Sequence, residues 1–117
     1  MLPARNRMTR SAEFTHTVRY GVRAPQPDLV VHAYRAQSGC DPHIGLIVAK
    51  SVGGAVDRHR VARRLRHAAR TVIADLNPAD RIVVRALPSS RDAQSARLES
   101  QLHSGVRRAY TLMERHR

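Results

Sequence analysis

The stretch from Val56 to Arg70 most constrains what this chain can fold into. Apolar residues recur at helical spacing through it and just beyond it, which predicts an amphipathic helix with one buried face. These apolar positions are Val61, Leu65, Ala68, Val72 and Leu76. At about 100° per residue, the opposite side of the helix carries a cationic row. That row contains His59, Arg63, Arg66 and Arg70, with Arg60, Arg64 and His67 beside it.

The charge on this predicted helix is one-sided. From Asp57 to Arg70 there are six arginines and one acid, so the segment contributes +5 to a total charge of +12. Like charges three or four positions apart repel each other and destabilise a helix by roughly a few tenths of a kcal/mol per pair. A solvated surface normally interleaves acids and bases, whereas a bound polyanion would relieve this repulsion. The pattern therefore favours phosphate binding over a passive surface.

Length and composition narrow the class of protein further. With 117 residues, the chain is long enough for one domain with a modest core. The strong positive charge indicates a nucleic acid or an anionic membrane surface as partner. No apolar run approaches the ~20 residues that span a membrane, and the N-terminus lacks the apolar segment of a secretory signal. Cys40 is the only cysteine, so no internal disulfide can form, and we expect a cytoplasmic protein with no membrane association.

Periodicity and turn residues predict a mixed α/β (α+β) domain over residues 1–117. We expect helices at residues 11–20, about 56–76 and 91–114, and strands at 28–36, 43–50 and 81–87, with a short extra strand near 22–24. This order, α-β-β-(β)-α-β-α, predicts a two-layer sandwich with a mostly antiparallel sheet. The strand at 43–50 is expected to run antiparallel to that at 28–36. Residues 1–10 carry three arginines and no acid, and we expect an extended basic arm that a partner would order.

The sequence contains no self-contained catalytic or metal-binding pattern. Gly53 and Gly54 are not followed by the GK[ST] ending of a phosphate-binding loop. The nine acids are scattered singly, which leaves no carboxylate pair for two-metal chemistry. The seven histidines lack zinc-motif spacing, and Cys40 has no basic motif nearby. We therefore predict no catalytic residue and no metal ligand in this chain. Phe14 has two interpretations, a core contact or a surface on which a base stacks, and the sequence does not choose between them.

A long central segment is similar to a known signature. Residues 44–66 read IGLIVAKSVGGAVDRHRVARRLR, preceded by Arg5-Asn6-Arg7 and by Ser11-Ala12-Glu13-Phe14. This resembles the bacterial ribonuclease P protein subunit, whose pattern is G-[LI]-x-V-x-K-x-[VI]-G-x-A-V-x-R-N-R-x-x-R after a basic R-N-R and an S-x-x-F helix. The resemblance spans residues 5 to about 90. It implies a fold with a left-handed β-α-β crossover, against the usual handedness.

The resemblance also implies a function as one subunit of an endoribonuclease. The protein would bind a catalytic RNA and the 5′ leader of precursor tRNA, one protein per RNA, while the RNA holds the catalytic centre and most of the Mg²⁺. The expected contacts to the catalytic RNA are Arg5, Arg7, Arg58, His59, Arg60, Arg63, Arg64, Arg66 and Arg70. The expected leader cleft consists of Phe14, Val18, Val30, His32, Lys50 and Ser51.

Four positions depart from the family pattern. His59 replaces the central asparagine of the second R-N-R, and Ser51 stands where a lysine is common. Val18 and His32 occupy positions that are often aromatic, so base stacking would depend more on Phe14. There are two alternative functions. A ribosomal-type or general RNA-binding protein with a related α/β sandwich would explain the charge and the fold without a cleavage role, and the second alternative is an autonomous nuclease.

Overall fold

A four-stranded sheet forms the middle of the molecule. The computed structural model describes residues 2–115. The strands are β1 (Val22–Pro25), β2 (Leu29–Arg35), β3 (His43–Ile47) and β4 (Asp80–Ala86). Their order in the sheet is β1-β2-β4-β3, with β1/β2 and β2/β4 antiparallel and β3/β4 parallel. The mostly antiparallel sheet predicted from the sequence is confirmed, and so is the short extra strand.

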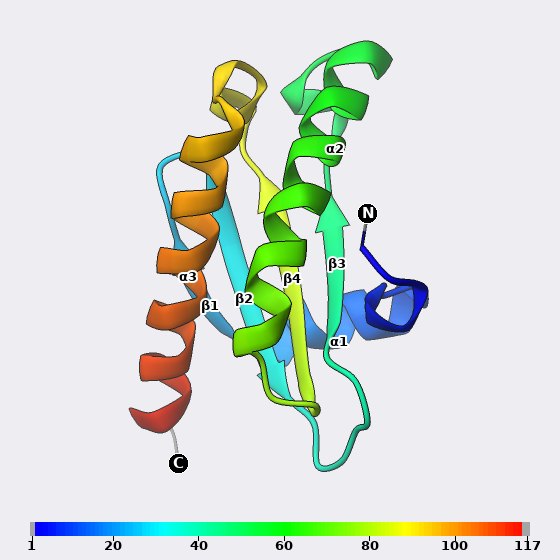
Figure 1. Ribbon diagram of the computed structural model, residues 1–117, viewed down its shortest axis with the longest axis vertical. Coiled ribbons are helices and arrows are strands. Elements are labelled where there is room, and N and C mark those ends of the chain that lie inside the picture. Colours follow the sequence, from blue (N-terminus) through cyan, green and yellow to red (C-terminus); the bar gives the residue numbers. More distant parts are fainter. Residues whose placement is uncertain (1, 116–117) are drawn as a thin grey trace.

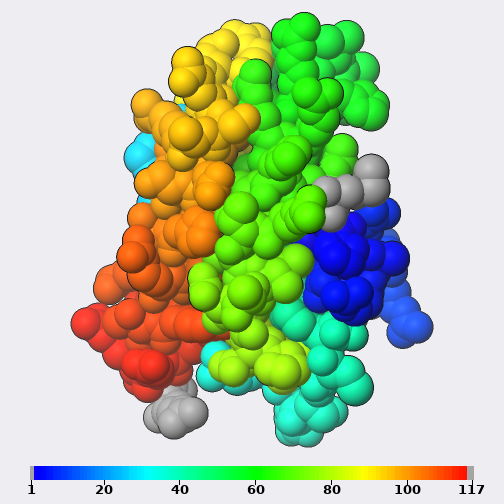
Figure 2. Space-filling model, in the orientation of Figure 1, coloured from blue at the N-terminus to red at the C-terminus, as the bar shows by residue number. Residues whose placement is uncertain are grey.

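Three helices cover the two faces of this sheet. They are α1 (Ser11–Tyr20), α2 (Ala55–Val72) and α3 (Ser95–Arg115), with short 3-10 segments η1 (Ala4–Asn6), η2 (Lys50–Val52), η3 (Ile73–Asp75) and η4 (Pro88–Asp92). Helices α2 and α3 lie side by side on one face (Figures 1 and 2), and together with the sheet they form the two predicted layers, to which α1 adds a single helix on the opposite face. Helix α1 lies behind the sheet in Figure 1 and packs on its other face against β2 and β4.

The connection from β3 through α2 to β4 has unusual handedness. In Figure 1, β3 and β4 point the same way, α2 lies in front of the sheet, and β4 lies to the left of β3. This is a left-handed β-α-β crossover, whereas nearly all such connections are right-handed. The expectation implied by the resemblance is confirmed.

The core lies between the sheet and the pair α2/α3. Helix α2 contributes Val61, Leu65, Ala68 and Val72, and α3 contributes Leu98, Leu102, Val106 and Ala109, all of them buried. The helical period therefore predicted the buried face correctly, except that α2 ends before Leu76. A methyl group on Gly105 would overlap the Val31 side chain, so glycine lets α3 approach β2 closely despite its low helix propensity.

Two buried carboxylates fasten α3 to the sheet region. Asp28 accepts hydrogen bonds of 2.6 Å from Arg97 Nε and from Gln101 Nε2. Burial alone would raise the pKa of Asp28, but hydrogen bonds from Ser89, Gln101 and Arg97 lower it overall. Asp80 accepts hydrogen bonds from Arg35 Nε at 2.8 Å and from the Tyr110 hydroxyl. Burial and this bond to Asp80 raise the pKa of Tyr110 to about 12.

Strands β2 and β3, which follow each other along the chain, are not neighbours in the sheet. Strand β3 does run antiparallel to β2, as predicted, but β4 lies between them and pairs with both. Parallel pairing of β3 with β4 requires a long crossover, and α2 supplies it. The strand also ends at Ile47 rather than at 50, because Lys50–Val52 turn into η2.

The N-terminal segment is not a free arm. Leu2 is 2% exposed, and Asn6 and Met8 are also buried. The Met8 N–H donates to the Ile44 carbonyl at 3.0 Å, and Asn6 Nδ2 donates to the Pro42 carbonyl at 3.0 Å. The prediction of an extended arm is therefore wrong for residues 2–8, because their apolar side chains pack into the fold beside β3; position 1 lies outside the described residues. No helix within residues 2–115 is long and apolar enough to cross a membrane.

Candidate RNA interface

Helix α2 presents the predicted cationic row to solvent. His59, Arg60, Arg63 and Arg70 are exposed, while Arg58 and Arg66 are half-buried. The apolar face of the same helix is in the core, so the charged side chains are held on a rigid element. The only acid in the first turn, Asp57, packs close to Gly53, whose φ of 155° is a backbone conformation that favours glycine. The close contact between Gly53 and Asp57 therefore defines where α2 begins.

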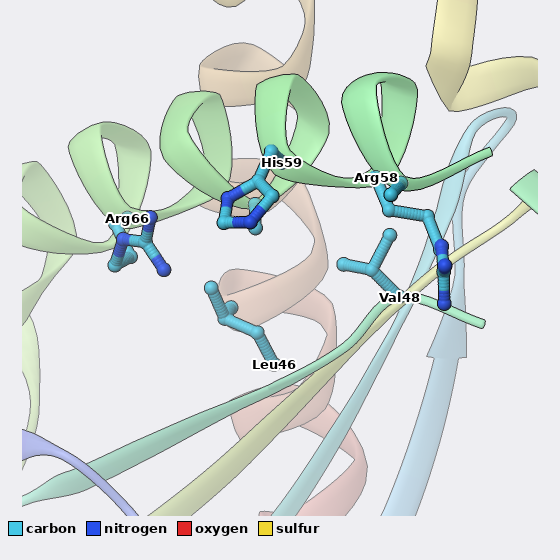
Figure 3. Close-up of a pocket in the computed structure, with 7 residues that line it drawn as sticks. Leu46, Val48, Arg58, His59 and Arg66 are labelled. Atoms are coloured by element: carbon cyan, nitrogen blue, oxygen red, sulfur yellow. The ribbon is translucent and has the colours of Figure 1, made fainter. Parts of the chain in front are cut away.

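A hollow of about 440 Å³ lies between the start of α2 and the end of β3. Its apolar floor includes Leu46 and Val48, and Arg58, His59 and Arg66 surround it (Figure 3). The Nε atom of Arg58 is buried and has no hydrogen-bond partner among residues 2–115. Cations around an apolar floor suit a polyanion that also carries flat apolar groups, as RNA does.

Arg64 has a different role from its neighbours. Its Nη1 donates to the Ala93 carbonyl at 3.0 Å and to the Arg91 carbonyl at 3.4 Å. These bonds hold η4 and the segment before α3 against α2. Arg64 still lines a second hollow between α2 and α3, together with Arg60, Arg63, His67, Ser95 and Glu99. Sequence analysis did not predict these contacts of Arg64, because η4 lies far from α2 along the chain.

Arg5 and Arg7 project from the docked N-terminal segment. Both are exposed, and Arg7 pairs with Ile44 through an isolated β-bridge beside β3. Arg7 Nε donates to the Leu2 carbonyl at 2.9 Å, and Arg5 Nε lies 3.9 Å from Asp41 Oδ1. The fold therefore places these two predicted RNA contacts along β3, the strand whose Leu46 forms part of the α2 hollow.

The other predicted surface is the sheet face beneath α1. Phe14 is half-buried and lies over Gly45 of β3, where a methyl group would overlap its ring. Val18, one turn later, is 39% exposed. Phe14 therefore makes the core contact while the residue stays partly exposed, and base stacking on its ring stays a prediction.

Two of the predicted cleft residues are buried. Val30 is 1% exposed and His32 is 4% exposed, so neither offers an open surface for a base. The expectation that these two side chains form an open cleft surface is therefore wrong, and their contact with the leader stays a prediction. They lie on the central strand β2, and its neighbours β1 and β4 place Arg23 opposite His32 and Arg85 opposite Val30. Arg23 and Arg85 are exposed, and sequence analysis missed them because their positions depend on strand register.

The environment of His32 favours the uncharged imidazole. Burial, and then the positive charges of Arg85 and Arg23, lower the pKa of His32. Neither ring nitrogen has a hydrogen-bond partner among residues 2–115. The ring is therefore a neutral part of the packed sheet face between two exposed guanidinium groups.

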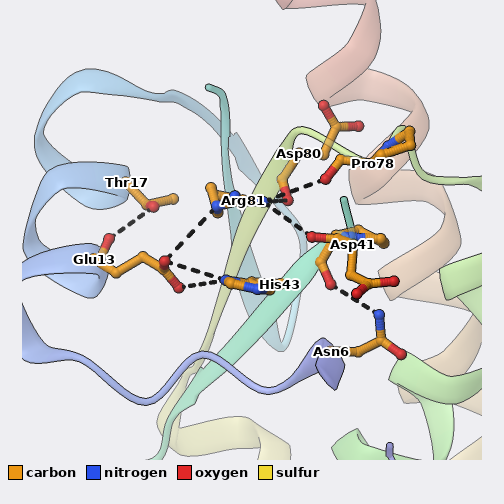
Figure 4. Close-up of polar contacts among 9 residues, drawn as sticks. Asn6, Glu13, Thr17, Asp41, His43, Pro78, Asp80 and Arg81 are labelled. Atoms are coloured by element: carbon orange, nitrogen blue, oxygen red, sulfur yellow. Dashed lines mark hydrogen bonds and ion pairs between the residues drawn. The ribbon is translucent and has the colours of Figure 1, made fainter. Parts of the chain in front are cut away.

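A polar cluster fixes α1 to the sheet (Figure 4). His43 Nδ1 lies 2.9 Å from Glu13 Oε1, and Arg81 Nε lies 3.7 Å from Glu13 Oε2. The Thr17 hydroxyl donates to the Glu13 carbonyl at 2.8 Å. Because Glu13 precedes Phe14, this cluster also fixes the position of the Phe14 ring.

The remaining predicted cleft residues join the two surfaces. Lys50 and Ser51 are exposed in η2, on the connection between β3 and α2. Within residues 2–115, no group of three histidine, cysteine, aspartate or glutamate side chains is placed to hold a metal ion.

Comparison with known proteins identifies the family. The family model for ribonuclease P matches residues 2–110. The ribonuclease P protein component of Mycobacterium ulcerans is 62% identical over 113 residues, which cover 94% of each chain. That of Mycobacterium tuberculosis is 59% identical over 112 residues, which cover 96% of each chain. A solved structure of a mutant RNase P protein from Staphylococcus aureus shares the fold, with a TM-score of 0.81 and 21% identity over 90% of this chain and 88% of that one. The chain therefore belongs to the ribonuclease P family.

Proposed function

We propose that this chain, as the protein component of ribonuclease P, holds the catalytic RNA on α2 and the 5′ leader of precursor tRNA along the α1 face of the sheet. Removal of the leader would generate the mature 5′ end of the tRNA. The observation that carries the proposal is that one domain presents two distinct cationic surfaces. One is the guanidinium row of α2, and the other combines Phe14 and Val18 with Arg23 and Arg85.

The α2 surface suits a folded RNA. Structured RNA is recognised mainly through phosphates and shape, because side chains cannot read the deep major groove of its helices. A row of arginines on a rigid helix offers planar donors that match phosphate oxygens. The exposed members, His59, Arg60, Arg63 and Arg70, can all reach such a partner without unfolding.

The α1 surface suits a single strand. Unpaired RNA is bound without strict sequence preference by cations that follow its backbone and by aromatic rings on which bases stack. Phe14 supplies the ring, Val18 an exposed apolar contact, and Arg23 and Arg85 the charge. Lys50 lies on the connection between this sheet and α2, which supports a path that links the two RNAs.

We assign the catalytic centre, and the Mg²⁺ it needs, to the RNA. Mg²⁺ prefers carboxylate, phosphate and water oxygens, whereas the α2 hollow is lined by Arg58, His59, Arg66 and apolar groups, which do not fit that ion. The two most buried carboxylates, Asp28 and Asp80, already bind arginines. The protein contributes positive charge that lets two polyanions approach. We further propose one protein per catalytic RNA, in a cytoplasm that keeps the exposed Cys40 thiol reduced.

Reconstitution with the cognate catalytic RNA tests this proposal. Precursor tRNA is incubated with protein alone, with RNA alone and with both, over a range of Mg²⁺ concentrations. We expect no cleavage by the protein, cleavage by the RNA only at elevated Mg²⁺, and cleavage by the complex at low Mg²⁺. Cleavage by the protein alone would instead identify a nuclease, and failure to assist the RNA would indicate a general RNA-binding protein.

A further inference from the structure

Helix α1 carries aromatic side chains on both flanks of its sheet-facing side. Phe14 and Val18 form one flank, and at about 100° per residue His16 and Tyr20 fall on the other. The ring centroids of His16 and Tyr20 are 4.8 Å apart, and His16 also meets Tyr34 of β2 edge-on at 4.6 Å. The chain has only four aromatic residues of the Phe, Trp and Tyr type, so two of them gather at this second flank.

Tyr20 is not a core residue. Its side chain is 61% exposed, one of the most exposed large apolar groups among residues 2–115. Tyr110 makes a useful contrast, because its hydroxyl donates to the buried Asp80 and its ring is half-buried. Tyr20 instead offers much of its ring to solvent.

The Tyr20 ring is nevertheless held in place. His16 contacts it at an interplanar angle of 50°, and the guanidinium carbon of Arg19 lies 5.4 Å from its centroid. His16 is itself held by the edge-on contact with Tyr34, at an angle of 81°. A ring that is already oriented loses little conformational freedom on binding, which favours it as a stacking surface.

The surroundings of the ring favour an anionic partner. Residues 2–36 include six arginines and two acids, and two of the arginines pair with acids elsewhere: Arg5 with Asp41 and Arg35 with Asp80. Arg19, which lies at the Tyr20 ring, has no ion pair among residues 2–115. Both acids are already paired: Glu13 with His43 and Arg81, and Asp28 with Arg97. A flat, exposed ring beside the Arg19 guanidinium matches a nucleotide, which has a stacking base and a charged phosphate.

We propose that Tyr20, supported by His16 and flanked by Arg19, is a second base-stacking site, which takes an unpaired nucleotide of the RNA strand bound at Phe14. The strand would cross α1 from the Phe14–Val18 flank to the Tyr20 flank. This inference rests on the proposed function and extends its single-strand surface. It therefore adds a contact that only a sufficiently long leader can reach.

Binding measurements with leaders of increasing length test the site. Precursor tRNAs with short and long 5′ leaders, and mature tRNA, are titrated with the wild-type holoenzyme and with holoenzymes containing Tyr20→Ala or Tyr20→Phe. Loss of one stacked base weakens binding by about tenfold. We expect this loss for Tyr20→Ala with long leaders only, and recovery in Tyr20→Phe, which keeps the ring. Because Tyr20 is exposed, both variants should unfold at the wild-type temperature.

A fluorescent base locates the contact directly. With 2-aminopurine at successive leader positions, we expect quenching at one position in the wild type and in Tyr20→Phe, and its absence in Tyr20→Ala. Equal binding by all three proteins at every leader length overturns the stacking site, as does an equal loss for mature tRNA. Failure of the proposed function gives a different result from failure of the Tyr20 site. In that case the wild-type protein itself would bind no precursor tRNA more tightly than mature tRNA.

Discussion

The ring of Phe14 lies over the backbone of Gly45, so close that a methyl group at position 45 would overlap the Cε1 and Cζ atoms of the ring. Glycine here is required by close approach rather than by backbone conformation, since β3 is a regular strand. One residue in the strand thus sets how deeply α1 sits on the sheet. The accessible part of Phe14 depends on this fit.

Gly45→Ala should therefore disturb both stability and leader binding. Overpacking at a tight contact typically destabilises a protein by about 1–3 kcal/mol, and we expect a loss of free energy of unfolding in this range. Displacement of Phe14 should also weaken binding of precursor tRNA more than that of mature tRNA. Chemical denaturation and competitive binding measure the two effects.

A compensating change serves as the control for Gly45→Ala. Adding Phe14→Leu removes the ring atoms that the methyl group would meet, so stability should recover while leader binding stays weak. If the double variant is as unstable as Gly45→Ala alone, the overlap with Phe14 is not the cause.

The α2 row predicts a charge-specific effect on RNA affinity. Arg60→Gln and Arg63→Gln should each weaken binding to the catalytic RNA, because both side chains are exposed on the cationic face. Each lost phosphate contact should reduce the slope of log affinity against log salt by about 1. Filter binding over a salt series measures this slope.

Arg108→Gln is the matched control, since it removes the same charge from an exposed position on α3. We expect its salt slope to stay close to that of the wild type. An equal reduction in all three variants would mean that net charge, rather than the α2 surface, determines binding.

Replacing Arg64 should destabilise the protein more than replacing its neighbour Arg63. Its bonds to the Ala93 and Arg91 carbonyls join α2 to η4, so Arg64→Ala should lower the free energy of unfolding by about 1–2 kcal/mol. Arg63→Ala removes an exposed charge from a row of like charges and should change stability by less than about 0.5 kcal/mol. Denaturant titration of the two variants checks this difference. Equal losses would show that the carbonyl bonds do not stabilise η4.

Local periodicity was sufficient to predict the three helices and the α2 surface, although α3 begins at Ser95 rather than near 91, because Pro88–Asp92 form η4. The apolar positions Val61, Leu65 and Ala68 follow one helical stripe, so their burial and the exposure of Arg63 follow from geometry within a single element. Helix α1 begins and ends at the predicted residues for the same reason. The overall pattern of elements is a local property of this chain.

Contacts between segments that are distant along the chain could not be predicted from local periodicity. Nothing local places β4 between β2 and β3, and that register alone brings Arg23 and Arg85 beside His32 and Val30. The alternation of apolar residues in β2 does not reveal that both of its faces are covered. In the N-terminal segment, the apolar Leu2 and Met8 were a signal of docking that the surrounding arginines obscured.

The buried His32 predicts a pH dependence of stability. Burial, Arg85 and Arg23 lower its pKa from the usual 6.5, so below that pH the unfolded chain binds more protons than the folded one. Its contribution to stability is present above pH about 6.5 and is lost as the pH falls through the folded-state pKa. The melting temperature of the wild type should therefore fall between about pH 7 and pH 5.

His32→Leu should flatten this fall, because leucine cannot be protonated and leaves no unpartnered ring nitrogen in the sheet. At pH 7 the variant should be at least as stable as the wild type, since burying a polar group without a hydrogen bond is unfavourable. His16→Gln, at an exposed position on α1, controls for the other histidines and should keep the wild-type pH profile. A His32→Leu profile as steep as that of the wild type would mean that another group causes the loss of stability in acid.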